Sequence, residues 1–282
     1  MTNNRFILKV NCKDERGIVA RITTPLYQWG CTLITLDQFT DLETERFFMR
    51  LTLEGEIDYD SLNQRLKPIF DQFEGDCSLI RYEQKMRLLI LCSKPDHCLV
   101  DLLAKTKRDS LPVEITGVIS NHDHLRQLVE WYGYPYHYLP VTEESKDSQE
   151  KQIAELFHSY KADIIILARY MQILSNKFCK QFEGKAINIH HSFLPSFKGA
   201  QPYKQAYNRG VKIIGATAHF VTGDLDEGPI IQQEIIRVNH THSPKDLAHY
   251  GADVEAIALS KAVKYTAEHR VFINDNKTVV LK

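Results

Sequence analysis

The feature that most constrains the fold is a regular alternation of short apolar runs and helix-like segments between residues 87 and 189. The run Ile-Ile-Ile-Leu-Ala at 164–168 has no polar residue, as expected of a strand buried on both faces of a parallel sheet. Further strands are predicted at 87–92, which is a near-continuous apolar run, and at 113–120, 136–139 and 186–189, which include polar residues. Helical spacing of apolar residues marks the segments between them, at 96–107, 122–133, 150–160 and 176–182. This alternation predicts a doubly wound, mostly parallel α/β domain.

The pattern changes after residue 210. Two further strands, 213–221 and 229–238, are predicted to extend the sheet as an antiparallel pair joined by a polar loop. A long helix follows, for which Ser243 is the expected N-cap, with Asp246 three residues later as in a capping box. The sheet is therefore expected to be mixed at one edge.

Residues 1–83 predict a separate and smaller domain. Its expected elements are strands at 6–10, 33–40, 46–53 and 77–82 and helices at 18–29 and 58–73. Their order is that of a ferredoxin-like βαββαβ unit, so the complete fold class is α/β with this unit in front. The hydrophilic segment 81–87 is typical of a linker, so we place the domain boundary within it and the second domain at 84–282. It then includes a terminal strand pair at 270–273 and 278–281.

Composition and charge exclude several classes of function. The formal net charge of −1 provides no global field that would attract nucleic acid or an anionic membrane. The polar start and the absence of a long apolar run predict a cytoplasmic protein without a membrane span. The six cysteines are scattered without a Cys-x-x-Cys pair, so we expect reduced core residues and no metal site.

Polar residues follow the most buried strands. Asn188 and His190 lie two residues apart at the end of the strand at 186–189, so their side chains are expected on the same face. The loop 222–228 brings Asp226 as a candidate carboxylate. An amide donor, an imidazole and a carboxylate at one strand end make a minimal hydrolytic or acyl-transfer site without a metal.

A structural role is the alternative for each of these groups. A buried Asn-x-His at a strand end is also typical of a structural hydrogen-bond network, and the nearby Asp226 makes catalysis the favoured interpretation. His219, in the middle of a predicted strand, is expected to be structural and to support Asp226. His191 should face away from His190 and form a wall of the pocket.

Three motifs in the second domain, taken together and in order, resemble the folate-dependent formyltransferase family. They are Leu-Ala-Arg-Tyr-Met-Gln-Ile-Leu at 167–174, Asn-Ile-His at 188–190 and His-Phe-Val-Thr-Gly-Asp-Leu-Asp-Glu-Gly at 219–228. The resemblance implies 10-formyltetrahydrofolate as the small-molecule substrate, with no further cofactor. It also implies that Asn188, His190 and Asp226 are catalytic. The implied substrate-binding residues are Arg169, Tyr170, Met171, Gln172, Leu174, His191 and Gly228.

The fuller run from 188 to 206 resembles the formyltetrahydrofolate deformylase branch of this family, in which water replaces an amine as the acceptor. Related transferases carry a glycine-rich phosphate loop after the first strand of the domain. The segment here, 92–97, has no glycine, and it contains Pro95 and Asp96, which disfavour a phosphate. Hydrolysis is therefore favoured. Formyl transfer to a small amine and a non-catalytic amino-acid sensor are the alternatives.

The first domain resembles an ACT domain, a regulatory module that often binds amino acids. The resemblance rests on the segment 14–20, whose free backbone N–H groups could hold a carboxylate. It implies an effector site around Asp14, Arg16 and Gly17. Thr32 stands where amino-acid-binding members typically carry asparagine, so dimerisation alone remains an equal alternative to ligand sensing. A homo-oligomer is expected in either case.

Overall fold

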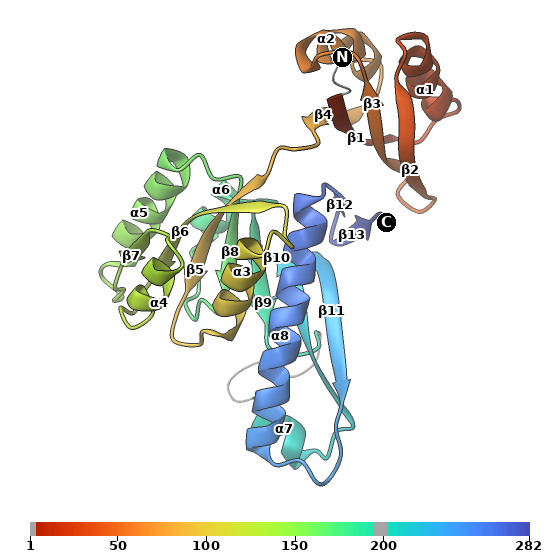
Figure 1. The fold of residues 1–282 in the computed structure, drawn as a ribbon. Coiled ribbons are helices and arrows are strands. Elements are labelled where there is room, and N and C mark those ends of the chain that lie inside the picture. The colour runs from red at the N-terminus through yellow and green to blue at the C-terminus, as the bar shows by residue number, and fades with distance from the viewer. Residues whose placement is uncertain (1–3, 195–201) are drawn as a thin grey trace. The chain divides into compact units, whose positions relative to one another are not determined.

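The computed structural model describes residues 4–194 and 202–282, and these form two compact units. The first unit contains the chain up to Gln84 together with residues 269–274 and 278–282. The second contains residues 85–268 and 275–277. Each unit is built around its own sheet (Figure 1).

The first unit is an antiparallel sheet covered by helices. The strands are β1 (Asn4–Lys13), β2 (Thr32–Asp41), β3 (Arg46–Gly55) and β4 (Gly75–Arg81), in the order β2-β3-β1-β4. The helices are α1 (Ile18–Gln28), which continues through Pro25, and α2 (Tyr59–Phe70). Alternate residues of β1 and β3, such as Leu8 and Leu51, pack in one core with Ile22 and Leu66 from the helices. The predicted βαββαβ order is confirmed.

A C-terminal hairpin completes the first unit. It consists of β12 (Val271–Asn274) and β13 (Lys277–Val280). The Phe272 ring packs edge-on against Phe48 with centroids 5.6 Å apart, and Lys9 Nζ donates to the Val271 carbonyl at 2.7 Å. The sequence analysis assigned this hairpin to the second domain, whereas most of its residues belong to the first unit. An isolated two-stranded hairpin is only marginally stable in water because it buries little apolar surface. The burial of Phe272 against Phe48 adds this apolar contact.

The second unit contains a seven-stranded mixed sheet with the order β11-β10-β9-β8-β5-β6-β7. Its strands are β5 (Met86–Cys92), β6 (Val113–Ser120), β7 (Tyr136–Tyr138), β8 (Ile164–Ala168), β9 (Ala186–His190), β10 (Ile213–Phe220) and β11 (Ile230–Arg237). The pairings from β9 to β7 are parallel, and those of β9 with β10 and of β10 with β11 are antiparallel. The predicted fold class, including the antiparallel edge, is confirmed.

Helices pack against this sheet (Figure 1). They are α3 (His97–Lys107), α4 (Arg126–Trp131), α5 (Lys146–Ser159), α6 (Asn176–Gln181), α7 (Pro202–Asn208) and α8 (Pro244–Ala267). Apolar residues of α5 and α6 share a core with β5, β6 and β8, while α8 lies along β10 and β11 and against α3. The predicted capping box of α8 is present, with Ser243 and Asp246 as its members. The sequence analysis did not predict α7.

The order of the strands marks one edge of the sheet as the expected place for a ligand. The chain runs outward from β5 in both directions, to β6 on one side and to β8 and β9 on the other, so a topological switch point lies between β5 and β8. Ligands of open α/β sheets bind beyond the carboxyl ends of strands at such a point. Within the described residues, no helix has the length and apolar character needed to cross a bilayer.

Candidate active site

The structure brings together the three residues predicted to be catalytic. Asn188 and His190 both come from the end of β9, and Asp226 comes from the loop between β10 and β11. Nδ1 of His190 lies 3.1 Å from Oδ2 of Asp226, and Nδ2 of Asn188 lies 3.5 Å from Oδ1 of the same carboxylate. The amide, the imidazole and the carboxylate therefore form one cluster. These groups can donate hydrogen bonds and exchange protons, and they lie close together, as general acid–base chemistry needs.

The environment of Asp226 keeps its carboxylate ionised. Burial alone would raise the pKa of Asp226, but hydrogen bonds with His190 and His219 hold it well below its ordinary value. His219 lies opposite Asn188 in the β9–β10 ladder, and its Nε2 is 3.6 Å from Oδ1 of Asp226. The Nδ1 nitrogen of His219 is 2.8 Å from the Phe220 carbonyl. This contact orients the imidazole toward the carboxylate, as predicted for a supporting residue.

One nitrogen of His190 is left for a ligand. Its Nδ1 faces Asp226, while its Nε2 is buried and has no hydrogen-bond partner among the described residues. An unpaired buried polar atom is costly, so a native structure keeps one where a ligand or water completes it. His190 also lines the adjacent cavity, so the ring nitrogen without a described partner belongs to a residue of the cavity wall.

A cavity of about 270 Å³ lies beside the cluster. It is lined by all of the predicted substrate-binding residues except Gly228, namely Arg169, Tyr170, Met171, Gln172, Leu174 and His191. The sequence analysis did not identify the opposite part of the lining, which includes Val221, Thr222, Gly223 and Leu225. Met171, Ile173 and Leu225 are each more than half exposed, and they present apolar surface to the cavity.

The segment after β8 is held in place by buried polar contacts. The Met171 N–H donates to Ser93 Oγ at 3.0 Å, and the Tyr170 hydroxyl donates to Oε1 of Gln149 at 3.0 Å. Arg169 has a φ of 61°, and Asp226 has a φ of 58°. Non-glycine residues in this left-handed region are uncommon and gather at functional sites. Both walls of the cavity thus carry a locally unfavourable backbone that surrounding contacts stabilise.

The structure shows the charge state of one predicted binding residue, His191, and the steric reason for another, Gly228. Burial, assisted by the charge of Arg169, lowers the pKa of His191 to about 4, so this imidazole is neutral near pH 7. Gly228 does not line the cavity. A Cβ atom at Gly228 would lie 1.8 Å from the Phe220 carbonyl oxygen, so glycine is required for the loop that carries Asp226 to return to β11.

The predicted effector residues lie in the first unit, away from any described cavity lining. Asp14, Arg16 and Gly17 are all exposed, and Gly17 is the N-cap residue of α1. The Asp14 N–H donates to the Glu45 carbonyl at 2.8 Å. A shallow open pocket on the same unit lies between α1 and β2, where Thr23, Thr24, Tyr27, Cys31, Thr32 and Leu33 line it. It includes none of the predicted effector residues.

A buried carboxylate near the site was not predicted. Glu255 is 2% exposed and lies on α8, where it contacts Arg169, His97 and Tyr203. The sequence did contain a clue that Glu255 is buried, because Glu255 follows Val254 within the apolar stripe of the helix. A charge inside such a stripe is almost never fully buried unless it is paired.

Comparison with known proteins identifies the family. The sequence model of one family, described as formyl transferase, matches residues 86–263. A relative from Corynebacterium sp. (strain P-1), named formyltetrahydrofolate deformylase, is 44% identical over 99% of this chain and 98% of its own length. The structure of a formyltetrahydrofolate deformylase from Burkholderia mallei superposes with a TM-score of 0.96 at 42% identity. It covers 99% of this chain and 100% of that one. The chain belongs to the formyltetrahydrofolate deformylase family, as the motifs predicted.

The fold extends to transferases. The structure of glycinamide ribonucleotide transformylase 1 from Symbiobacterium toebii matches 70% of this chain and 95% of its own at a TM-score of 0.67 and 28% identity. Proteins named as deformylases and proteins named as transformylases therefore share this fold. The fold alone does not distinguish the two groups, so the distinction has to come from particular side chains.

Proposed function

We propose that this chain hydrolyses 10-formyltetrahydrofolate to formate and tetrahydrofolate. The observation that carries the proposal is the Asn188–His190–Asp226 cluster beside a cavity, in a chain that is similar over its full length to deformylases. The reaction would supply formate for purine synthesis and balance the pool of one-carbon folates. We expect it to take place in the cytoplasm.

The proposed chemistry follows from the position of each group. Asp226, ionised and bonded to His190, orients a water molecule and accepts its proton as the oxygen attacks the formyl carbon. Asn188 donates a hydrogen bond to the oxyanion that forms. The C–N10 bond then breaks, and N10 of tetrahydrofolate takes a proton through Nε2 of His190, the ring nitrogen that has no protein partner among the described residues.

The cavity is the proposed folate site. Backbone groups of the segment 169–174 bind the polar edge of the pterin, while Met171 and Leu225 cover its faces. His191 is neutral, so it forms a wall without adding charge next to the formyl group. Gly228 acts indirectly, through the loop that presents Asp226.

A single assay tests the proposed function. The purified chain is incubated with 10-formyltetrahydrofolate and no amine, and formate and tetrahydrofolate are measured separately. Equal amounts of the two products are expected. Turnover that requires an added amine would show that the chain is a transferase. Folate binding without any turnover would support the remaining alternative, a non-catalytic sensor.

We also propose that the first unit binds an amino-acid effector at Asp14, Arg16 and Gly17. The supporting observation is that these residues are exposed at the start of α1, where backbone N–H groups of the first turn can receive a carboxylate. Glycine, methionine or serine is expected to change the rate of formate release and to lose this effect in Arg16→Ala. An unaltered rate with all three amino acids would exclude them as effectors.

A second copy of the chain is the partner that we propose for strand β2. This strand is an edge of its sheet, and it exposes Leu33, Ile34, Leu36 and Phe39. An open apolar edge of this kind favours pairing with another strand, and two identical edges pair with twofold symmetry. Phe39→Asp is expected to convert the oligomer to smaller species in sedimentation analysis. Trp131→Asp, an equally drastic change at an exposed residue of α4, should leave the mass unaltered. A monomeric wild-type chain would refute the proposal.

A further inference from the structure

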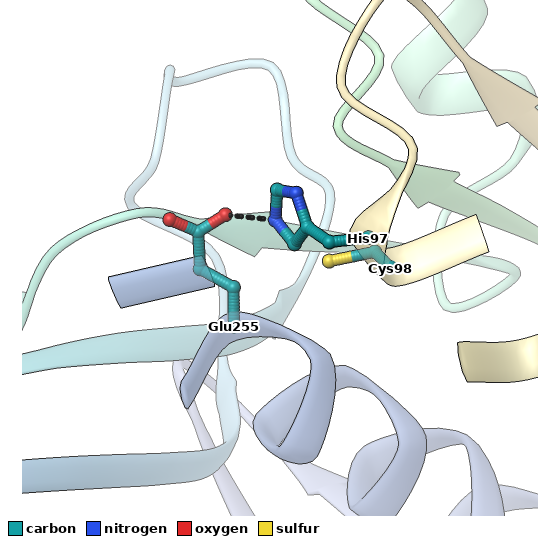
Figure 2. A group of neighbouring side chains, drawn as sticks. All are labelled: His97, Cys98 and Glu255. Carbon is teal, nitrogen blue, oxygen red and sulfur yellow. Dashed lines mark hydrogen bonds and ion pairs between the residues drawn. The ribbon is translucent and has the colours of Figure 1, made fainter. Parts of the chain in front are cut away.

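A buried network centred on Glu255 joins four separate elements of the second unit. Oε1 of Glu255 accepts a hydrogen bond from the Tyr203 hydroxyl of α7 at 2.6 Å. Oε2 lies 2.7 Å from Nε2 of His97, the first residue of α3, and 3.4 Å from Nε of Arg169, which follows β8. Figure 2 shows the His97 ring and the Glu255 carboxylate pointing toward each other from α3 and α8.

The network is better described as ion pairing than as a metal site. Cys98 lies close to His97 and Glu255, and these three residues could in principle provide ligands for a metal ion. Burial, however, raises the pKa of the Cys98 thiol well above its ordinary value, whereas metal ions bind the thiolate. Both carboxylate oxygens of Glu255 already have partners, and one partner is the permanent cation Arg169. A dication would have to displace that charge.

Charge balance keeps Glu255 ionised in its buried position. Burial alone would raise the pKa of Glu255, but His97, Arg169 and Tyr203 together hold it below its ordinary value. The carboxylate thus remains a fixed anion that attracts all three partners. Breaking such a buried group from its partners is far more costly than breaking a surface ion pair.

The network lies directly beside the catalytic cluster. Arg169 is a member of the network and also lines the cavity that contains His190 and Asp226. The ring of His191 is 5.0 Å from that of His190 and 6.4 Å from that of Tyr203. The pKa of His191 is influenced by both Glu255 and Asp226, which lie at opposite ends of this series of rings. A cavity of about 30 Å³ lies between His191 and Tyr203, which leaves room for little more than a water molecule behind His191.

The position of Tyr203 depends on a glycine, Gly251, whose lack of a side chain leaves space for the phenol ring. Gly251 precedes Glu255 by one helical turn on α8 and faces the same side. A Cβ atom at Gly251 would lie 2.1 Å from both Cζ and the hydroxyl oxygen of Tyr203. The helix leaves space for the phenol ring at this point, so Tyr203 is seated there by shape as well as by its hydrogen bond.

We propose that the network of His97, Arg169, Tyr203 and Glu255 is a wall that restricts the nucleophile to water. The network stands behind Arg169 and His191, which line the cavity, and it leaves little more than the space of a water molecule between His191 and Tyr203. A primary amine is therefore kept from the formyl carbon, whereas water is not. This inference rests on the proposed hydrolysis. It assigns specificity to residues that take no part in proton transfer. If the wall is opened, an amine nitrogen forms the new bond to the formyl carbon, the C–N10 bond breaks, and the amine proton is transferred to N10.

The test measures how formyl groups are divided between water and an amine. The wild type, His97→Ala and Tyr203→Ala are incubated with 10-formyltetrahydrofolate and glycinamide, and formate and N-formylglycinamide are quantified against a protein-free blank. We expect formate alone from the wild type. In both variants the ratio of amide to formate should rise at least about tenfold, because a pocket that gains a few atoms of space typically changes discrimination by that amount. Gly251→Ala, which displaces Tyr203, should raise the ratio in the same direction.

Tyr207→Ala is the matched control, because Tyr207 lies on the same helix one turn later and is 46% exposed. An unaltered ratio in both His97→Ala and Tyr203→Ala overturns the inference, and so does a folded variant that binds folate but has lost both reactions. If these variants do not fold, Tyr203→Phe and His97→Gln decide the question by the same ratio. Failure of the wild type to release formate would instead refute the proposed function.

Discussion

Asp226→Asn is expected to lower kcat for formate release by about 10³-fold or more while folate affinity changes little. The carboxylate is held ionised by His190 and His219, and in the proposed mechanism it alone accepts the proton of the attacking water. An amide has nearly the same shape but cannot accept that proton. Asparagine also tolerates the left-handed backbone at this position, where φ is 58°, so the loop should keep its conformation.

Asp224→Asn provides the control for this prediction. Asp224 is exposed on the same loop, and the chemical change is identical, so its kcat should match that of the wild type. Folate binding is measured by equilibrium titration in all three proteins. Retention of full activity by Asp226→Asn would remove Asp226 from the mechanism, and an equal loss in Asp224→Asn would attribute the effect to the loop as a whole.

Asn188→Ala is expected to lower kcat by about 10²- to 10³-fold, which corresponds to about 3 kcal/mol of lost oxyanion stabilisation. The effect should appear in kcat and in kcat/KM equally, because the proposed hydrogen bond forms only when charge develops on the formyl oxygen. Asn188 is held close to Asp226 and His219, so its amide does not need to reorganise during the reaction.

Two variants make the assignment of Asn188 specific. Asn188→Asp keeps the shape of the side chain, but it removes the N–H donor and adds a negative charge next to Asp226. It should be at least as impaired as the alanine variant. Asn208→Ala, at an exposed residue on α7, should behave as the wild type. A higher KM with unaltered kcat in Asn188→Ala would show that Asn188 binds the substrate without stabilising the oxyanion.

The two walls of the cavity have a backbone feature in common. Arg169 and Asp226 both have positive φ, and each side chain contacts a buried polar partner, Glu255 in one case and His190 in the other. Such backbone strain persists only where surrounding contacts over-determine it. The wall that positions the reacting groups and the wall that is proposed to exclude amines are thus stabilised in the same way.

Local patterns were sufficient to predict most elements of the fold. Near-continuous apolar runs identified β5 and β8, because a strand buried on both faces has no polar side to display, and the alternation with helices identified β6, β7 and β9. The capping box of Ser243 and Asp246 marked the start of α8 for an equally local reason. Helix α7 was missed, since its seven residues, Pro202–Asn208, show no clear apolar stripe, and α4 proved shorter than its predicted range of 122–133.

The sequence by itself determined the fold class, the family and the side chains that form the cluster of Asn188, His190 and Asp226, because strand alternation and motif spacing are local properties. Only the tertiary structure decided that the C-terminal hairpin packs against Phe48 and that Glu255 joins His97, Arg169 and Tyr203. His97 and Glu255 are 158 positions apart in the chain. Periodicity shows that a residue is buried, but its partner is set by long-range packing, which no local pattern encodes.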